Sequence, residues 1–181
     1  MDELTQQLEQ QIPRLRRYAL ALVGDPTRAD DLVQDCLERA WSRGHLFRPG
    51  SDLRAWLFTI LHNLHANASR RYNTRPAEVS LADETYTPST AATQGDIVAL
   101  NELRSALTEV PEDQRQVLLM VGMEQMTYQE VAIVLGIPIG TVMSRLHRGR
   151  ERLRELLGTP RKSNKPEEVV DTGSPEMKAK A

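Results

Sequence analysis

The chain has 181 residues, of which 40% are hydrophobic and 27% charged, and its formal net charge at pH 7 is -2. This composition is typical of a folded globular protein and excludes a chain that is disordered throughout. No stretch approaches the roughly 18 consecutive apolar residues of a membrane span, and the acidic, polar start is unlike a secretory signal, so we expect a cytoplasmic protein. The single cysteine, Cys36, excludes an internal disulfide and a zinc site built from several thiolates.

Charge is unevenly distributed along the chain. Residues 1–75 carry 11 basic and 9 acidic side chains, whereas residues 76–110 carry 1 and 6. Residues 111–157 balance at 6 and 6, but five of those six basic residues fall between Arg145 and Arg154. A local basic segment therefore lies within a nearly neutral chain.

Apolar residues recur at helical spacing through the first 74 residues, and no long run alternates with the period of a strand. The first predicted helix carries its apolar stripe from Leu4 to Leu22 and ends at a Gly-Asp-Pro turn. The second begins at a capping box of Thr27 and Asp30, and its core face ends with Trp41. These patterns predict an all-α protein.

The opposite side of the second predicted helix is acidic and polar. Its residues follow the spacing i, i+3, i+4, i+7, which places them in one stripe. Such a stripe is either a solvated face or a docking surface for a basic partner, because aligned carboxylates steer association. The stripe consists of Asp31, Gln34, Asp35 and Glu38.

A polar loop, residues 42–50, leads to a third predicted helix that is capped by Ser51 or Asp52. The far end of this helix is polar and basic. Two amides and two guanidinium groups share one face there, which is either ordinary surface or a track for single-stranded nucleic acid. These residues are Asn63, Asn67, Arg70 and Arg71.

The helical pattern is lost over residues 75–95, which are rich in Pro, Ser, Thr and acid, and we interpret them as a flexible interdomain linker. The sequence thus predicts two small domains, residues 1–74 and 96–157, followed by a disordered tail, residues 158–181. The second domain ends in two helices joined by the short turn IPIG, an arrangement typical of a helix-turn-helix.

The last predicted helix presents polar and basic side chains on its outward face. Arginines there either contact guanine edges and phosphates or form a solvated helix end, and their position directly after the turn favours DNA binding. The candidates are Thr141, Ser144, Arg145 and Arg148.

The sequence gives little indication of an enzyme. His62 and His65 lie on one helix but have no third metal ligand nearby in the sequence, so we expect no metal site. Glycine-rich phosphate loops and nucleophile elbows are absent from the sequence, so we expect no cofactor, no small-molecule substrate and no enzyme.

Four segments, together spanning roughly residues 10–157, resemble bacterial extracytoplasmic-function (ECF) RNA polymerase sigma factors of the sigma-70 family. They are ADDLVQDCLERAW, FRPGSDLRAWLFTILHNL, VPEDQRQVLLM and MTYQEVAIVLGIPIGTVMSRLHRGRERLR. The opening, from residue 12 to residue 41, is most similar to the general-stress-response group. The resemblance implies that the domains are sigma regions 2 and 4.

The resemblance also implies roles for the candidate residues. The acidic stripe would bind the β′ clamp helices of RNA polymerase core, and region 4 would approach the β flap. Region 2 would capture and melt the -10 element through Asn63, the basic helix end and a loop containing Phe47, Arg48 and Ser51. The last helix would read the -35 major groove, although Met143 stands where many relatives carry a basic residue.

An anti-sigma factor is a further partner that the resemblance implies. Two other functions stay open: a sigma mimic that sequesters an anti-sigma factor, and a simple helix-turn-helix regulator acting as a dimer.

Overall fold

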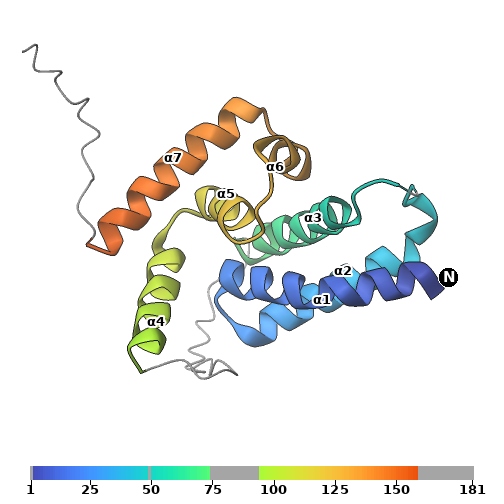
Figure 1. Ribbon diagram of the computed structural model, residues 1–181, viewed down its shortest axis with the longest axis horizontal. Helices are drawn as coiled ribbons and strands as arrows, with labels where there is room; N and C mark the ends of the chain where they lie inside the picture. Colours follow the sequence, from blue (N-terminus) through green and yellow to red (C-terminus); the bar gives the residue numbers. More distant parts are fainter. Residues whose placement is uncertain (1, 49, 74–93, 159–181) are drawn as a thin grey trace, which may run out of the picture.

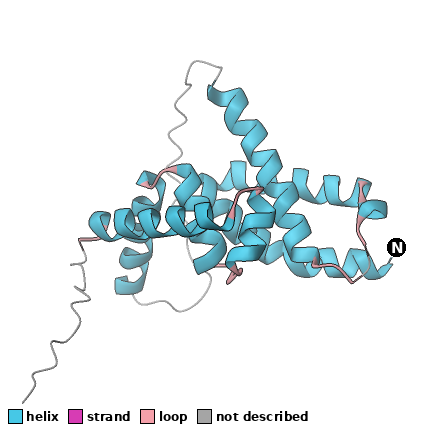
Figure 2. Ribbon diagram, turned by 90° about the horizontal axis from the view of Figure 1, so that it is seen from above, coloured by secondary structure: helices cyan, strands magenta, loops and turns pink. Residues whose placement is uncertain are grey.

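The computed structural model describes residues 2–48, 50–73 and 94–158. Within these ranges every regular element is helical, which confirms the predicted all-α class (Figures 1 and 2). The elements are α1 (Asp2–Val23), α2 (Pro26–Ser42), the 3-10 helix η1 (Gly44–Leu46), α3 (Leu53–Asn73), α4 (Gln94–Glu109), α5 (Glu112–Gly122), α6 (Tyr128–Leu135) and α7 (Ile139–Leu156).

Helices α1 to α3 form the first module. α2 packs against both α1 and α3, and the rings of Tyr18 and Phe58 meet edge to face with centroids 4.9 Å apart. α1 runs without interruption through Pro13. Leu8 and Leu15 are buried on either side of that proline, so tertiary packing holds the helix together where Pro removes a backbone hydrogen bond.

Two expectations for α2 are wrong. Asp25, rather than Thr27, caps the helix by accepting a hydrogen bond from the backbone N–H of Arg28, and Pro26 occupies the first turn. Trp41 is 53% exposed rather than part of the core. Because each helical residue rotates by about 100°, Trp41 turns off the face on which Ala40 is buried.

Helices α4 to α7 form the second module, in which α7 packs on α5 and α6. Thr127 and Glu130 form a complete capping box at the start of α6, and Gly136 ends this helix with a left-handed φ of +63°. The axes of α6 and α7 then meet at 103°. The predicted helix-turn-helix is therefore present.

Among the described residues, no single helix is long and apolar enough to cross a membrane; α6 and α7 pass the test of length and composition only as a sharply bent pair.

The two modules pack against each other. α6 lies on α3, and α5 and α4 lie on α1 (Figure 1). Buried apolar residues of both modules belong to one continuous cluster that extends from Leu8 in α1 to Leu146 in α7. The predicted linker lies outside the described residues except that α4 already begins at Gln94, and the predicted tail lies outside them beyond Gly158.

We predict that Thr127→Ala lowers the free energy of unfolding by about 0.5 to 2 kcal/mol, the usual loss on removing a helix cap. The Thr127 hydroxyl accepts from the Glu130 backbone N–H, and the Glu130 carboxylate accepts from the Thr127 N–H at 2.6 Å. Urea unfolding followed by circular dichroism measures the loss. Gln129→Ala, an exposed change in the same helix, is the control; an equal effect of both variants would contradict the capping role.

Candidate DNA-binding and protein-binding surfaces

The acidic stripe of α2 is exposed over its whole length. Asp31, Gln34, Asp35 and Glu38 are all accessible, and the Gln34 amide donates a hydrogen bond of 3.0 Å to Glu38. The structure confirms that these four side chains share one exposed helix face.

The stripe also borders a groove between α2 and α3, which the sequence did not reveal. Asp31 and Asp35 line one part of this groove together with Leu32 and Leu64, and Leu64 continues into the part beside Glu38. Carboxylates and leucines thus line the groove together, with Arg28 and Arg39 also in its lining. This combination suits a partner that presents basic and apolar side chains together.

The loop before α3 has a fixed base and an accessible tip. The ring of Phe47 packs against that of Trp56 in α3, with the ring centroids 5.3 Å apart and the ring planes at 44° to each other. The Ser51 hydroxyl donates a 2.6 Å hydrogen bond to the carbonyl of Arg48, whose own side chain is exposed. Of the two predicted caps, Asp52 is the one observed, since its carboxylate accepts from two backbone N–H groups at the start of α3.

The amide and basic face of α3 continues from this loop. Asn63, Asn67 and Arg70 are exposed, whereas the side chain of Arg71 lies outside the described residues. Asn63 follows the first residue of α3 by ten positions, which is about 15 Å along a helix. The amide face therefore begins about three turns along α3 from the loop.

His62 and His65 do not form a metal site with other described residues, among which no group of three potential ligands occurs. His65 is buried, and its Nε2 lies 2.9 Å from Glu112 Oε1 in the second module. Burial lowers the pKa of both histidines. Their role in the structure is to pack where the modules meet.

The four predicted residues of α7 differ in how exposed their side chains are. Ser144 and Arg148 are exposed, and Thr141 is half-buried. Arg145 is also half-buried, because α7 packs on α5 there and the Arg145 Nε lies 3.2 Å from Asp113 Oδ2. Arg145 can reach DNA only by leaving or sharing this carboxylate.

Sequence reasoning named Met143 on this face only as a departure from the family, and it missed His147. Met143 and His147 are exposed beside Ser144 and Arg148. Positions 143, 144, 147 and 148 are the i, i+1, i+4, i+5 pattern of a single helix face. Helical spacing counted from Ser144 identifies His147, but attention to arginine charge alone does not.

Ion pairs restrict the uncompensated charge of α7 to its middle. Arg152 pairs with Glu155 and Arg154 pairs with Glu151, all within the last turns of the helix. Arg148 instead donates to the backbone carbonyl of Ser144. The middle of α7 therefore offers net positive charge on an exposed face, as binding to a DNA backbone requires.

Cys36 has no reactive character. Its thiol is buried and lies within hydrogen-bonding distance of the Leu57 carbonyl, and burial raises its pKa to about 12. A thiol that stays protonated is a poor nucleophile and a poor metal ligand. Cys36 thus serves the core of the first module.

Each module matches a known protein family. Residues 8–62 match the family described as the Sigma2 domain of PhyR, and residues 100–153 match Sigma-70, region 4. Each matched range lies within one of the two modules of the structure.

Curated relatives and solved structures cover most of the chain. The ECF RNA polymerase sigma factor EcfG of Rhodopseudomonas palustris is 40% identical over 158 residues, which are 86% of each chain. The ECF sigma factor SigL of Mycobacterium tuberculosis is 36% identical over 149 residues, 79% of this chain and 82% of that one. The sigma factor RpoE of Bartonella quintana, solved in complex with the anti-sigma factor NepR, gives a TM-score of 0.74 at 32% identity, covering 89% of this chain and all of the other.

Proposed function

Because the chain belongs to the ECF family of RNA polymerase sigma factors, whose role is transcription initiation, we propose that it directs core polymerase to promoters with a -35 and a -10 element. The observation that supports this most directly is that one chain presents two exposed surfaces of different chemistry. The acidic groove of α2 and α3 suits a protein partner, and the outward face of α7 suits DNA.

For core binding we assign the stripe of Asp31, Gln34, Asp35 and Glu38. The β′ clamp helices, which the family resemblance implies as partner, would place basic side chains on the carboxylates. Leu32 and Leu64 would receive apolar side chains between them. Region 4 would contact the β flap separately, so that core is bound at two places.

For the -10 element we assign the loop and the exposed face of α3. Phe47, Arg48 and Ser51 would hold an extruded base, because the loop tip is accessible while its base is fixed against Trp56. The downstream bases and phosphates would follow Asn63, Asn67, Arg70 and Arg71. Trapping unpaired bases in this way offsets the cost of opening the duplex.

For the -35 element we assign α7, with Ser144 and Arg148 as the accessible contacts and Thr141 and Arg145 beside them. His147 joins this set because it shares their exposed face. Met143 offers an apolar surface, which suits a thymine methyl rather than a phosphate.

We further propose an anti-sigma factor as partner and a general stress response as the setting. Two relatives of known structure, the Bartonella quintana sigma factor and CnrH, were solved with anti-sigma factors. CnrH is 26% identical with a TM-score of 0.64. The similarity to EcfG supports the stress-response group.

A sigma mimic is the second candidate function. The match of residues 8–62 to the Sigma2 domain of PhyR favours it, since PhyR of Bartonella quintana is named an anti-anti-sigma factor. A mimic needs the surface for the anti-sigma factor but not a basic face for DNA. The exposed positive charge of α7 therefore favours the sigma factor.

In vitro transcription with purified core polymerase on a pool of promoter fragments tests the proposal. We expect new transcripts that start downstream of a shared two-part element only when the chain is added. If the chain binds an anti-sigma factor but yields no transcript, the mimic replaces the sigma factor. If it binds neither core nor an anti-sigma factor but shifts duplex DNA, a simple regulator replaces both.

We predict that Asp31→Lys with Asp35→Lys weakens binding to core about tenfold or more, because like charges then face the basic partner. A competition assay with labelled wild-type chain measures this affinity. Glu9→Lys with Glu102→Lys is the matched control, since both residues are exposed and the net charge changes equally. Equal affinities of the two double variants would remove the stripe from the interface.

We predict that Arg148→Ala weakens binding to a -35 duplex by about 1 to 3 kcal/mol, the usual range for a lost base contact. Arg154→Ala is the control, because Arg154 pairs with Glu151 at the far end of α7. Fluorescence anisotropy at fixed salt measures both affinities. A loss of the same size for Arg154→Ala would show that general charge, not a contact of Arg148, is responsible.

A further inference from the structure

The exposed face of α7 takes its direction from contacts on the opposite side of the helix. Val142, Leu146 and Gly149 are buried there, at the spacing i, i+4, i+7 that forms a single stripe. This side of α7 packs on α5 and α6. The rotation of α7 about its own axis therefore determines which side chains face outward, namely those at positions 143, 144, 147 and 148.

Gly149 allows a close approach between α7 and α5. A β-carbon at this position would lie 2.9 Å from Cδ1 and 3.0 Å from Cγ of Leu118, and 3.3 Å from the β-carbon of Gln114. Both of these residues belong to α5. Glycine weakens the interior of a helix relative to alanine, so its presence here is explained by the packing. The two helices are close enough that a rotation of α7 would require side chains of α5 to move.

Arg145 lies on the flank of α7 that meets α5. At about 100° per residue it stands roughly 130° around the helix from the middle of the exposed face, and its side chain is only 26% exposed. The Arg145 Nε lies 3.2 Å from Asp113 Oδ2 in the first turn of α5. Burial lowers the pKa of His62 in α3, and the charge of Arg145 adds to that lowering. The guanidinium is therefore directed toward α5 and α3 rather than toward the exposed face.

Asp113 places a negative charge beside a helix that we assign to DNA. Its side chain is 48% exposed, and a carboxylate there repels the phosphate backbone. If this carboxylate had no other role, its removal would strengthen binding to every duplex alike. If it holds Arg145, and with it the rotation of α7, its removal would instead weaken the distinction between one duplex and another. The two roles therefore differ in a measurable way.

We propose that Asp113 and Arg145 are positioning residues: their contact fixes the rotation of α7 on α5, and Arg145 acts through this contact instead of touching DNA. The inference rests on the proposed function, because it names residues that determine the specificity of the same -35 surface. Base contacts then come from the exposed face alone. A small rotation of that face matters, because hydrogen bonds to base edges weaken steeply as donor and acceptor lose their alignment.

Holoenzyme assembled from core polymerase and the full chain tests the proposal. The measured quantity is the ratio of its affinities for two duplexes, a promoter selected from the pool described above and the same promoter with its -35 element shuffled. Asp113→Asn and Arg145→Ala are each expected to lower this ratio about twofold to fivefold, which corresponds to the strength of a partly exposed ion pair.

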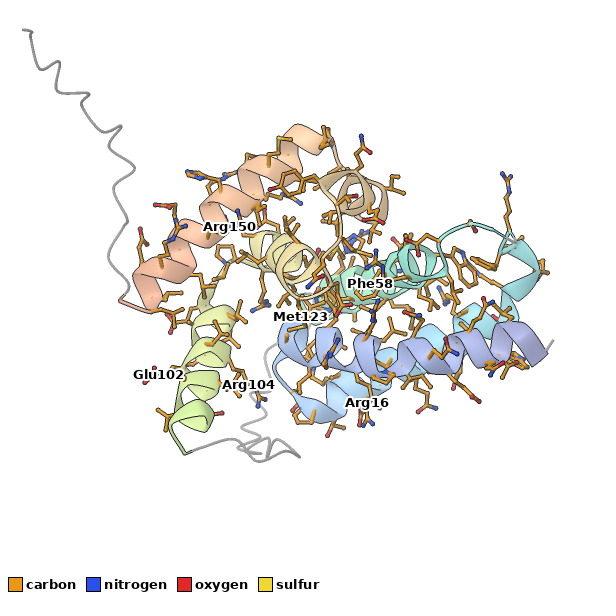
Figure 3. The ribbon with its side chains drawn as sticks, viewed as in Figure 1. Arg16, Phe58, Glu102, Arg104, Met123 and Arg150 are labelled. Atoms are coloured by element: carbon orange, nitrogen blue, oxygen red, sulfur yellow. The ribbon has the colours of Figure 1, made fainter. Side chains whose placement is uncertain are left out.

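Glu109→Gln and Arg150→Ala are the matched controls, because each removes the same charge from an exposed position of the second module. Figure 3 labels Arg150, which follows Gly149 on α7. Both controls are expected to change the two affinities equally and to leave their ratio at the wild-type value.

A charge swap separates positioning from direct contact. Asp113→Arg together with Arg145→Asp reverses the pair and keeps the net charge, so it is expected to recover at least half of the ratio that Arg145→Asp loses alone. A direct contact between Arg145 and DNA would not be recovered, because the swapped chain has no arginine at that position. An unchanged ratio in Asp113→Asn, or a swapped chain as poor as Arg145→Asp, overturns the proposal.

Urea unfolding of the same variants keeps this result separate from that of the proposed function. The single variants Asp113→Asn and Arg145→Ala and the double variant give the coupling between the two side chains in the absence of DNA. If the coupling is present but the affinity ratio does not respond, the contact only stabilises the fold and the positioning role fails. If the wild-type holoenzyme selects no promoter, the proposed function fails and the -35 consequence with it. The coupling then decides alone whether the pair holds α7 on α5, and zero coupling overturns that contact.

Discussion

Burial of α5 and α6 against α1 and α3 is the constraint on which the rest of the structure depends. It merges two small helical modules into one apolar cluster, and it brings the polar residues Arg54, His65 and Glu124 into contact with the other module. Small domains bury a limited fraction of their surface, so a shared interface adds burial that neither module achieves alone.

This interface differs chemically from the core of either module. Within the first module Tyr18 and Phe58 pack ring to ring, whereas the hydroxyl of the same tyrosine is buried near Glu112 and Glu124 of the second module and has no hydrogen-bond partner among the described residues. A permanent core rarely retains such groups.

The candidate surfaces are supported by the fold in different ways. The groove beside Asp31 and Asp35 is lined by residues of both α2 and α3, including Leu64. The loop at Phe47 packs on α3 through its aromatic contact with Trp56. The turn at Gly136 sets the direction of α7 relative to α6. The proposed protein-binding surface is thus shared by two helices, whereas the proposed -35 surface is a single helix whose inner side packs on α5.

The sequence by itself determined the helices, the two modules and the polar faces, because spacing along a helix depends only on local geometry. The acidic stripe, the amide face of α3 and the helix-turn-helix all follow from it. Tertiary structure alone decided that Trp41 is exposed, that Asp113 holds Arg145, and that His65 meets Glu112. These facts depend on which helices pack together, and the spacing of residues within one helix carries no information about its neighbours.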